Sequence, residues 1–297
     1  MRRQSNWPRW NSAPAPEDRV TTLEQALQKA QAAGLERLDA QMLLLHVLGR
    51  STHDRAWLLA HDTDALAAPV QAAFEAGVRR RRGGEPLAYI TGHKEFFGLD
   101  LQVDARVLVP RPDTEALVDW ALSLLADTPT ATVLDLGTGS GAIALALKAS
   151  RPELSVRATD FSAEALAVAR SNAARLHLDI TFQQGSWLEN VDGHYQLIVS
   201  NPPYIAAQDR HLADLLHEPV QALTAGDDGL DDLRRIIAQA PAHLHAGGWL
   251  LLEHGYDQAD AVRRLLLESG FQTVGSRRDL GDIERCSSGQ LPWPALS

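Results

Sequence analysis

The chain has 297 residues, of which 45% are hydrophobic and 22% charged, and its formal net charge at pH 7 is −10. This length accommodates two domains, and the composition is that of a globular protein and excludes a fibrous or largely disordered one. The single cysteine, Cys286, excludes an intrachain disulfide, and no apolar run reaches the roughly 18 residues of a membrane span. Because the N-terminus also lacks the apolar core of a secretory signal, we expect a cytoplasmic protein that binds no membrane.

The charge is unevenly distributed along the chain. Residues 1–82 contain 12 Lys and Arg against 9 Asp and Glu, whereas residues 83–297 contain 16 against 29. The acidic second part argues against a surface that binds the phosphates of a nucleic acid. The basic run at residues 79–82 is either a phosphate contact or, as is more common, a solvated helix end with cations near the negative end of the helix dipole.

The first part of the chain has a helical pattern. Residues 1–17 are rich in Pro, Asn and Ser, and we expect them to be disordered. From Thr22 to Arg82 apolar residues repeat every three to four positions, which predicts a small all-α domain over residues 18–83. Thr21 or Thr22 can cap the first helix, while Gly34 and Gly49 mark helix ends. Residues 84–109 are then expected to form a β-hairpin linker with strands at 87–90 and 95–103.

Beyond residue 110, strands and helices alternate as in a parallel sheet with helical crossovers. Expected helices include residues 114–125, 163–176, 230–245 and 257–269. Strands are expected at 132–136, 155–159, 180–183, 195–200, 248–253 and 271–276, and residues 279–290 can supply a final antiparallel strand.

A glycine-rich turn, Gly137-Thr138-Gly139-Ser140-Gly141, follows the first of these strands. Glycine permits positive φ and close approach of a ligand, but the spacing differs from the G-x-G-x-x-G of dinucleotide-binding turns. Asp135, two residues before the turn, would repel a pyrophosphate and suits an ammonium group. Asp160 ends the next strand, 23 residues after Gly137, and can accept bonds from both ribose hydroxyls. These features predict an adenosine ligand that carries an amino acid, namely S-adenosylmethionine.

Asn201-Pro202-Pro203-Tyr204 lies where a buried strand is expected to end. The prolines remove two backbone donors and stiffen the turn, so the Asn201 side chain and the Asn201 and Pro202 carbonyls form an acceptor-rich array. Such an array suits a planar NH2 group, against which Tyr204 can lay an aromatic face. Alone, the stretch is also compatible with a proline turn beside a surface tyrosine; the glycine turn upstream favours a binding site.

The glycine turn and Asn-Pro-Pro-Tyr, 64 residues apart, resemble the amino-methylating branch of the class I S-adenosylmethionine-dependent methyltransferases. Further segments are similar to the peptide chain release factor glutamine methyltransferases, of which Arg111-Pro112-Asp113-Thr114-Glu115 is the most specific. The others are residues 84–92, 95–99, 135–141, 218–223 and 251–255. This resemblance covers roughly residues 22–286. It implies an α/β fold: a Rossmann-like, seven-stranded catalytic domain over residues 110–297, preceded by a helical substrate-recognition domain and a hairpin linker.

The resemblance also implies an activity and a site. The enzyme would methylate the side-chain amide nitrogen of the glutamine in the Gly-Gly-Gln motif of class I release factors, with S-adenosylmethionine as methyl donor and without a metal. The cofactor would lie on Gly137, Thr138, Gly139, Ser140 and Gly141, with Asp160 at the ribose, Trp187 near the adenine and Asn201 near the methyl group. The substrate amide is expected among Asn201, Pro202, Pro203 and Tyr204, of which Asn201, Pro202 and Tyr204 are the catalytic candidates. We expect a monomer.

Some assignments keep an alternative. The family often has an acidic residue just before the position of Trp187, whereas this chain has Ser186, a weaker acceptor for the adenine amino group. This departure concerns cofactor affinity, not activity. Trp187 can also be an ordinary core aromatic, and Phe97 either packs in the hairpin or lies over the bound cofactor. His93, His194 and His254 are expected to be structural, because the reaction does not require a general base.

Two other functions are alternatives to this one. An adenine or guanine amino-methyltransferase acting on DNA or RNA would use the same Asn-Pro-Pro-Tyr on a flipped base. The acidic catalytic half and the lack of an appended basic domain count against it. A non-enzymatic module that binds a partner is disfavoured because both the glycine turn and Asn-Pro-Pro-Tyr are intact.

Overall fold

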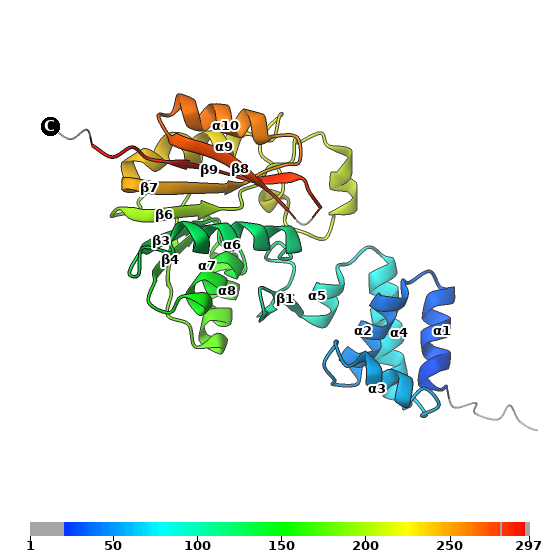
Figure 1. Cartoon of the computed structure of the whole chain (residues 1–297). Coiled ribbons are helices and arrows are strands. Elements are labelled where there is room, and N and C mark those ends of the chain that lie inside the picture. The colour runs from blue at the N-terminus through cyan, green and yellow to red at the C-terminus, as the bar shows by residue number, and fades with distance from the viewer. Residues whose placement is uncertain (1–20, 280, 295–297) are drawn as a thin grey trace, which may run out of the picture. The chain divides into compact units, whose positions relative to one another are not determined.

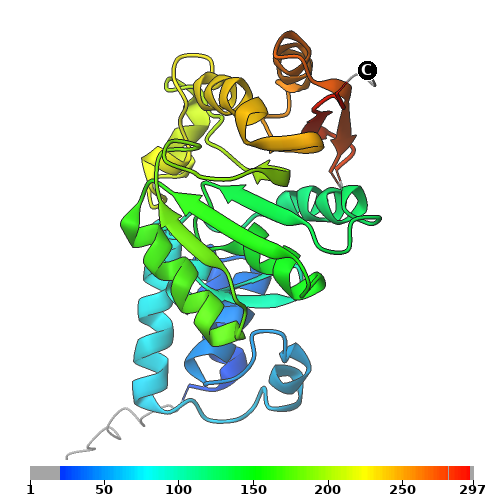
Figure 2. The ribbon, with the colours of Figure 1, turned by 90° about the vertical axis from the view of Figure 1, so that its left-hand side faces the viewer.

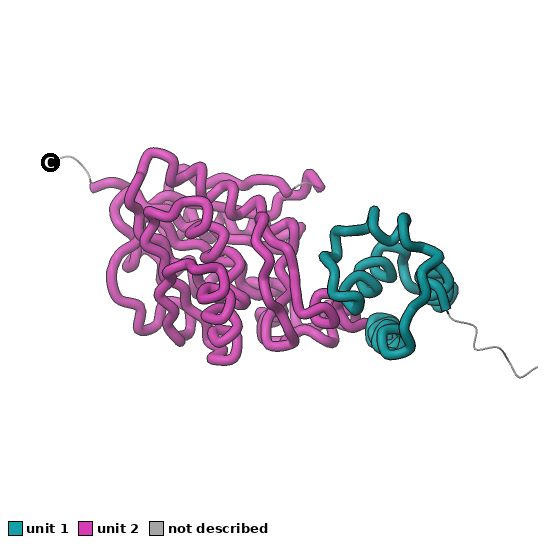
Figure 3. The backbone as a smooth tube through the Cα atoms, turned by 90° about the horizontal axis from the view of Figure 1, so that it is seen from below, with its two compact units in different colours: residues 1–83 teal, residues 84–297 magenta. Residues whose placement is uncertain are grey.

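The computed structural model describes residues 21–279 and 281–294. They form two compact units, one that extends to Gly83 and one that begins at Gly84 (Figure 3). The disorder expected for residues 1–17 falls outside the described residues. Within the described ranges, no helix has both the length and the apolar character that crossing a bilayer requires.

The first unit contains helices packed around a small apolar core. Thr22 caps α1 in a capping box with Gln25, as one of the two expected caps, and Gly34 and Gly49 take left-handed conformations after α1 and α2. Arg81 donates to Asp39 at 2.6 Å and so ties α4 to α2. The helices of this unit are α1 (Leu23–Ala32), α2 (Arg37–Val47), α3 (Arg55–Ala60) and α4 (Ala68–Arg82).

The predicted strand at residues 87–90 is wrong: these residues form the short helix α5 (Leu87–Thr91). A short apolar run does not distinguish a strand from a helix, and here Gly92 ends the helix with φ +77°. The predicted strand at residues 95–103 is also wrong as a single strand: a turn at residues 97–98 divides it, and the antiparallel hairpin is formed by β1 (His93–Phe96) and β2 (Leu99–Gln102). Residues 84–109, predicted as a linker, lie within the second unit.

The second unit is built on a seven-stranded sheet with the order β5-β4-β3-β6-β7-β9-β8 (Figure 1). Strands β3 to β7 run parallel to one another, while β9 is antiparallel to both β7 and β8. The expected strands are therefore confirmed, including the final antiparallel one. They are β3 (Thr132–Leu136), β4 (Ser155–Asp160), β5 (Thr181–Gln184), β6 (Tyr195–Ser200), β7 (Leu244–Glu253), β8 (Gln272–Arg278) and β9 (Glu284–Gln290).

Helices cover both faces of this sheet (Figures 1 and 2). Residues of α6 (Glu115–Leu124), α7 (Ala142–Ser150) and α8 (Ala163–Leu176) pack with one face, where Val133 lies. Residues of α9 (Asp231–Gln239) and α10 (Ala259–Glu268) pack with the other, where Leu134 lies. Because successive strand residues point to opposite faces, each central strand contributes to both cores. The sheet is thus buried on both sides, which gives its carboxyl edge a fixed geometry.

The helix expected at residues 230–245 is wrong in its C-terminal part. Helix α9 ends at Gln239, a 3-10 turn covers Ala240–His243, and β7 begins at Leu244. Pro241 lies in this turn, where it has no backbone N–H to continue the helical hydrogen bonds. β7 therefore begins directly after the turn, at Leu244, and is longer than the strand expected at 248–253.

Candidate active site

The glycine turn connects β3 to α7. Gly137, Gly139 and Gly141 have φ of +69°, +56° and +88°, a region that L-residues with a Cβ rarely occupy. A Cβ on Gly137 would lie 3.2 Å from the ring of Trp187, and one on Gly141 would lie 2.9 Å from Leu145. The turn therefore requires glycine both for its conformation and for the space around it.

Asp135 supports this turn from inside the protein. It is fully buried, and its Oδ2 accepts from the Thr138 hydroxyl at 2.6 Å and from the Ala144 N–H at 3.3 Å. Burial raises the pKa of Asp135 to about 7. Asp135 is not among the residues that line the cavity, and its Oδ1 has no hydrogen-bond partner among the described residues; that it faces an ammonium group stays a prediction.

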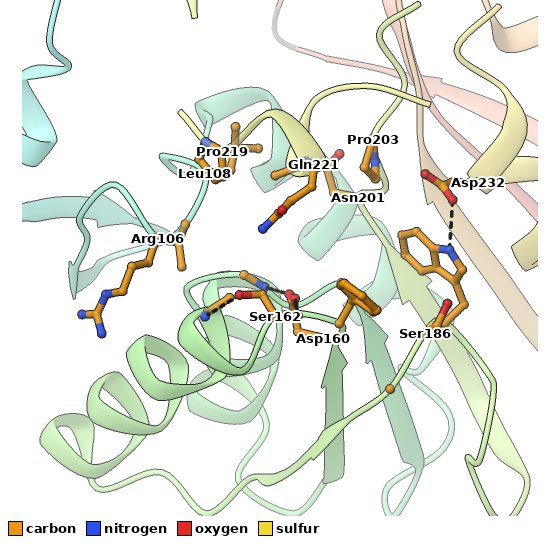
Figure 4. Close-up of a pocket in the computed structure, with 18 of the residues that line it drawn as sticks. Arg106, Leu108, Asp160, Ser162, Ser186, Asn201, Pro203, Pro219, Gln221 and Asp232 are labelled. Carbon is orange, nitrogen blue, oxygen red and sulfur yellow. Dashed lines mark hydrogen bonds between the residues drawn. The ribbon is translucent and has the colours of Figure 1, made fainter. Parts of the chain in front are cut away.

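Asp160 ends β4 beside the turn. One carboxylate oxygen accepts from the Gly139 N–H and the other from the Ser162 N–H, both at 2.8 Å (Figure 4). Burial raises its pKa, and the two backbone donors oppose that effect. Each oxygen holds one backbone hydrogen and keeps a further lone pair, so the carboxylate can accept additional hydrogen bonds from a ligand.

Trp187 is fixed on the other side of the glycine turn. Its φ is +51°, and its indole N–H donates to Asp232 Oδ1 of α9 at 3.0 Å (Figure 4). The ring packs against the α9 side of the core, which confirms the core alternative, and it also lines the cavity; its place near the adenine stays a prediction. The indole is thus held in a single orientation by a partner 45 residues away.

Asn201 follows β6 at the carboxyl edge of the sheet. Its side-chain NH2 donates to the Thr114 hydroxyl at 3.2 Å, and Thr114 is itself 4% exposed. Tyr204 packs against the same core as Trp187, and its carbonyl accepts from Gln258 at 3.0 Å. Burial raises the pKa of the Tyr204 hydroxyl, which therefore stays protonated.

These elements enclose a cavity of about 300 Å³. Of the predicted site residues, its lining contains Gly137, Gly139, Asp160, Trp187, Asn201 and Pro203. The other predicted site residues are not part of the lining: Thr138, Ser140, Gly141, Pro202 and Tyr204. For Thr138 the reason is local, because its hydroxyl and its N–H are bonded to Asp135 and Thr159. The structure thus brings the two motifs to one cavity, but through only part of each motif.

Several lining residues were missed by sequence reasoning. Ser186 lines the cavity, and the sequence singles it out only as a departure from the family pattern, whereas Phe161 could be found because it directly follows Asp160. Ser162, Ala165 and Gly185 lie close along the chain to residues already named. The rest carry no local sequence signal and come from distant segments: Arg106, Val107, Leu108, Pro219, Gln221, Ala222, Asp232 and Arg235. Figure 4 shows Arg106 and Leu108 on one side of the cavity and Gln221 reaching toward its interior.

Glu218 connects its own segment to the segment that contains residues 106–111. It is 5% exposed, forms an ion pair with Arg111, and accepts from the Val109 N–H at 3.1 Å. The Tyr89 hydroxyl holds the same segment by donating to the Val107 carbonyl at 2.5 Å. The cavity wall formed by residues 106–108 is therefore fixed by a helix and an acidic side chain that sequence reasoning had not connected with it.

The three histidines have other partners. His93 bonds to Asp100 in the hairpin, and the rings of His194 and His245 lie 5.7 Å apart. His254 is buried, its Nε2 lies 2.7 Å from the Ser287 hydroxyl, and burial lowers its pKa, so it is neutral. Phe97 packs against the core beside α6 and does not line the cavity.

The chain matches two described families. Residues 116–275, more than half of the chain, match the methyltransferase small domain. Residues 20–92 match the PrmC N-terminal domain. Among solved structures, a methyltransferase from Pyrococcus furiosus aligns with 73% of this chain and 98% of its own length, with a TM-score of 0.51 and 18% identity. This likeness shows the class I methyltransferase fold.

Much closer relatives cover nearly the whole chain. A release factor glutamine methyltransferase from Bordetella pertussis is 52% identical over 87% of this chain and 96% of its own length. One from Pseudomonas aeruginosa is 50% identical over 86% of this chain and 92% of its own length. Identity at this level over both units, together with the two family matches, shows that the chain belongs to the release factor glutamine methyltransferases.

Proposed function

We propose that this enzyme transfers a methyl group from S-adenosylmethionine to the side-chain amide nitrogen of the glutamine in the Gly-Gly-Gln motif of class I release factors. The observation that carries the proposal is the position of Asn201. Its amide lines the same cavity as the glycine turn and Asp160, with the NH2 end held by Thr114. Membership of the family supplies the expected substrate class.

The residues of the cavity fit S-adenosylmethionine. A volume of about 300 Å³ lies at the lower end of the range of small-ligand sites. Because Gly137 has no side chain, a ligand can lie close to its backbone. A Cβ at this position would contact the ring of Trp187. Asp160 presents a carboxylate with unused lone pairs, which suits the two ribose hydroxyls.

Two aromatic side chains line the part of the cavity next to Asp160. Phe161 is 73% exposed although it is large and apolar, and Trp187 is fixed by Asp232. Flat apolar faces of this kind suit the adenine ring. Ser186 lines the cavity beside them and can accept from the adenine amino group only weakly, whereas the carboxylate of Asp232 lies close by and is a stronger acceptor.

The chain's own residues position the substrate amide. An amide nitrogen is a poor nucleophile because its lone pair is delocalised into the carbonyl. Asn201 Oδ1 and the Pro202 carbonyl can accept its two N–H bonds, which fixes its plane and favours pyramidalisation as positive charge develops on nitrogen. Bound S-adenosylmethionine supplies an electrophilic methyl, so the S–C bond breaks as the N–C bond forms. The nitrogen then loses one proton, and no buried base is required for that step.

The rival activity on nucleic acid bases is disfavoured by the comparisons. A 16S rRNA N2 G1207 methyltransferase from T. thermophilus, solved with AdoMet and guanosine, shares the fold with a TM-score of 0.50 but only 17% identity. The relatives at about 50% identity are release factor glutamine methyltransferases. The acidic composition of residues 83–297 is also unfavourable for contacts with phosphates.

The proposal predicts the outcome of a three-way transfer assay. With labelled S-adenosylmethionine, the enzyme should methylate a purified class I release factor on the Gly-Gly-Gln glutamine, as located by peptide mass spectrometry. It should not label DNA or RNA. A release factor in which that glutamine is replaced by asparagine is the matched control, since the amide is retained but displaced by one methylene. Label in nucleic acid, or on another glutamine, would contradict the proposal.

We further propose that the helical unit recognises the release factor. A fragment of residues 84–297 contains every cofactor residue named above and both large apolar cores. It should bind S-adenosylmethionine with an affinity close to that of the full chain. A single extended glutamine offers little contact, whereas specific protein complexes usually bury about 1,200–2,000 Å². The fragment should therefore methylate a whole release factor less efficiently, mainly through a higher KM.

Comparison of two substrates separates recognition from stability. On a short Gly-Gly-Gln peptide, which cannot contact a second unit, the fragment and the full chain should be equally efficient. Loss on both substrates together with a lower Tm would indicate that the helices only stabilise the catalytic unit. Equal efficiency on the whole release factor would show that the helical unit does not recognise the substrate.

A further inference from the structure

Glu253 is a buried acidic residue directly behind the candidate catalytic asparagine. It is the last residue of β7 and is 1% exposed. In the parallel pairing of β6 and β7, Ser200 lies opposite Leu252, so the next residues along the two strands, Asn201 and Glu253, are neighbours at the carboxyl edge. A charged group rarely occupies such a position unless it has partners.

The surroundings of Glu253 belong to the site. Thr114 and Asn201, which are bonded to each other at 3.2 Å, lie beside its carboxyl and lower its pKa, while Arg285 of β9 and Asp113 before α6 act on it as charges. Tyr204 and Cys286 are the other titratable groups that interact with it. Among the described residues, no side chain or backbone group bonds to Oε2. Glu253 thus retains a free acceptor in a nearly dry environment next to Asn201.

The hydrogen-bond partners around Asn201 determine which end of its side-chain amide faces the interior. Its side chain has a donor end and an acceptor end of nearly equal shape, so a rotation of 180° about its last bond would exchange them. The Thr114 oxygen already accepts from the Asn201 NH2 at 3.2 Å. An ionised carboxylate can only accept, so it draws the hydroxyl hydrogen of Thr114 and the second hydrogen of Asn201 toward itself. Both amide hydrogens then face the interior, and Oδ1 is left for the cavity.

We propose that Glu253 is a positioning residue for catalysis: with Thr114 it fixes the side-chain amide of Asn201 so that Oδ1, and not the NH2 group, faces the substrate. The inference rests on the proposed function, since it concerns how Asn201 meets a glutamine amide. A reversed Asn201 would present a donor to the N–H bonds of the substrate and would repel them.

The ionisation of Glu253 agrees with this role. Burial raises its pKa to about 7, and the hydrogen bonds from Thr114 and Asn201 and the charge of Arg285 oppose this. For an acid whose pKa is raised by folding, the contribution to stability is full below its pKa in the unfolded chain, about 4.3, and is lost as pH rises through about 7. At pH 8 the ionised carboxylate therefore lowers stability, although it provides the acceptor that Asn201 requires.

The variant Glu253→Gln tests the proposal because it keeps the shape and removes the charge. It should lower kcat roughly 10- to 100-fold, as expected when a reacting group loses its alignment. The Kd for S-adenosylmethionine should not change, and Tm at pH 8 should not fall. In the wild type, kcat should rise with pH through a midpoint near 7, and this acid limb should be missing from the variant.

The double variant Asn201→Ala/Glu253→Gln shows whether Glu253 acts through Asn201. If it does, adding Glu253→Gln to Asn201→Ala should cause no further loss in single-turnover rate. Asp279→Asn is the matched control, since Asp279 is the other buried carboxylate that faces Arg285 and it pairs with it at 3.1 Å. This control should retain kcat. A Glu253→Gln enzyme within about threefold of wild type, or losses that add in the double variant, would overturn the proposal.

A second pair of variants covers the case in which Glu253→Gln does not fold. Thr114→Val removes the hydroxyl that holds the Asn201 NH2 and should lower kcat, whereas Thr114→Ser keeps the hydroxyl and should restore it. Equal kcat for the two would count against the proposal. A wild-type enzyme that does not methylate the release factor would instead refute the proposed function, and that result is available before any variant is compared.

Discussion

Replacing Asn201 with alanine is expected to lower kcat for release-factor methylation about 100- to 1000-fold, the usual effect of removing one oriented partner of a transition state. The physical reason is that Oδ1 accepts an N–H bond whose hydrogen becomes more acidic as the nitrogen becomes positive. Cofactor binding should change only modestly, because Asn201 is one of many lining residues and its side chain is bonded to Thr114. Single-turnover transfer at saturating S-adenosylmethionine measures the chemical step directly.

The exposed Gln208, on the segment that follows Tyr204, supplies a matched control. Gln208→Ala removes an amide of similar size from the surface and should leave kcat and KM unchanged. If Asn201→Ala turned over within about threefold of wild type, Asn201 would not be the residue that orients the substrate amide. A large rise in the cofactor Kd with normal kcat would instead move Asn201 from the substrate to the cofactor.

The parts of the fold that could be predicted from the sequence are those specified locally. Strand β3 is a short, mostly apolar segment followed by glycines, and α8 carries a helical repeat that ends near His177. Asn201 and Asp160 could be placed because each directly follows a recognisable strand, and strand ends of a parallel sheet meet at one edge. For these residues, sequence position determines spatial position.

The rest of the site depends on contacts between distant segments. Residues 106–108 line the cavity only because Glu218 and Tyr89 hold them, over sequence separations of 109 and 18 residues. No periodicity or turn signal in that stretch indicates a binding wall. Likewise Asp232 became relevant only when α9 placed its carboxyl against the Trp187 indole. The sequence does not distinguish the short helix α5 from a strand, because four apolar residues suit either structure until their tertiary partners are known.

Replacing Asp160 with alanine is expected to weaken cofactor binding much more than it slows the saturated reaction. The carboxylate lies beside the glycine turn, far along the chain from Asn201, so the variant leaves the array that holds the substrate amide intact. Loss of a charged acceptor for hydroxyl groups costs roughly 1.5–3 kcal/mol, which corresponds to a rise in Kd of about 10- to 150-fold. The Gly139 and Ser162 N–H groups also lose their acceptor, and this adds to the effect on the turn.

Calorimetric titration with S-adenosylmethionine measures this change, and adenosine serves as a second ligand. Because Asp160 is expected to bind the ribose, the fold-loss should be similar for both ligands, whereas a group that binds the amino acid part would discriminate between them. Asp127→Ala, at an exposed position before β3, removes the same charge from the surface and should leave both affinities unchanged. An unchanged Kd for the Asp160 variant would remove this carboxylate from the cofactor site.

The affinity for S-adenosylmethionine should also depend on pH. Burial raises the pKa of Asp160, so the wild-type affinity should fall as pH is lowered toward that pKa. The alanine variant should lack this dependence.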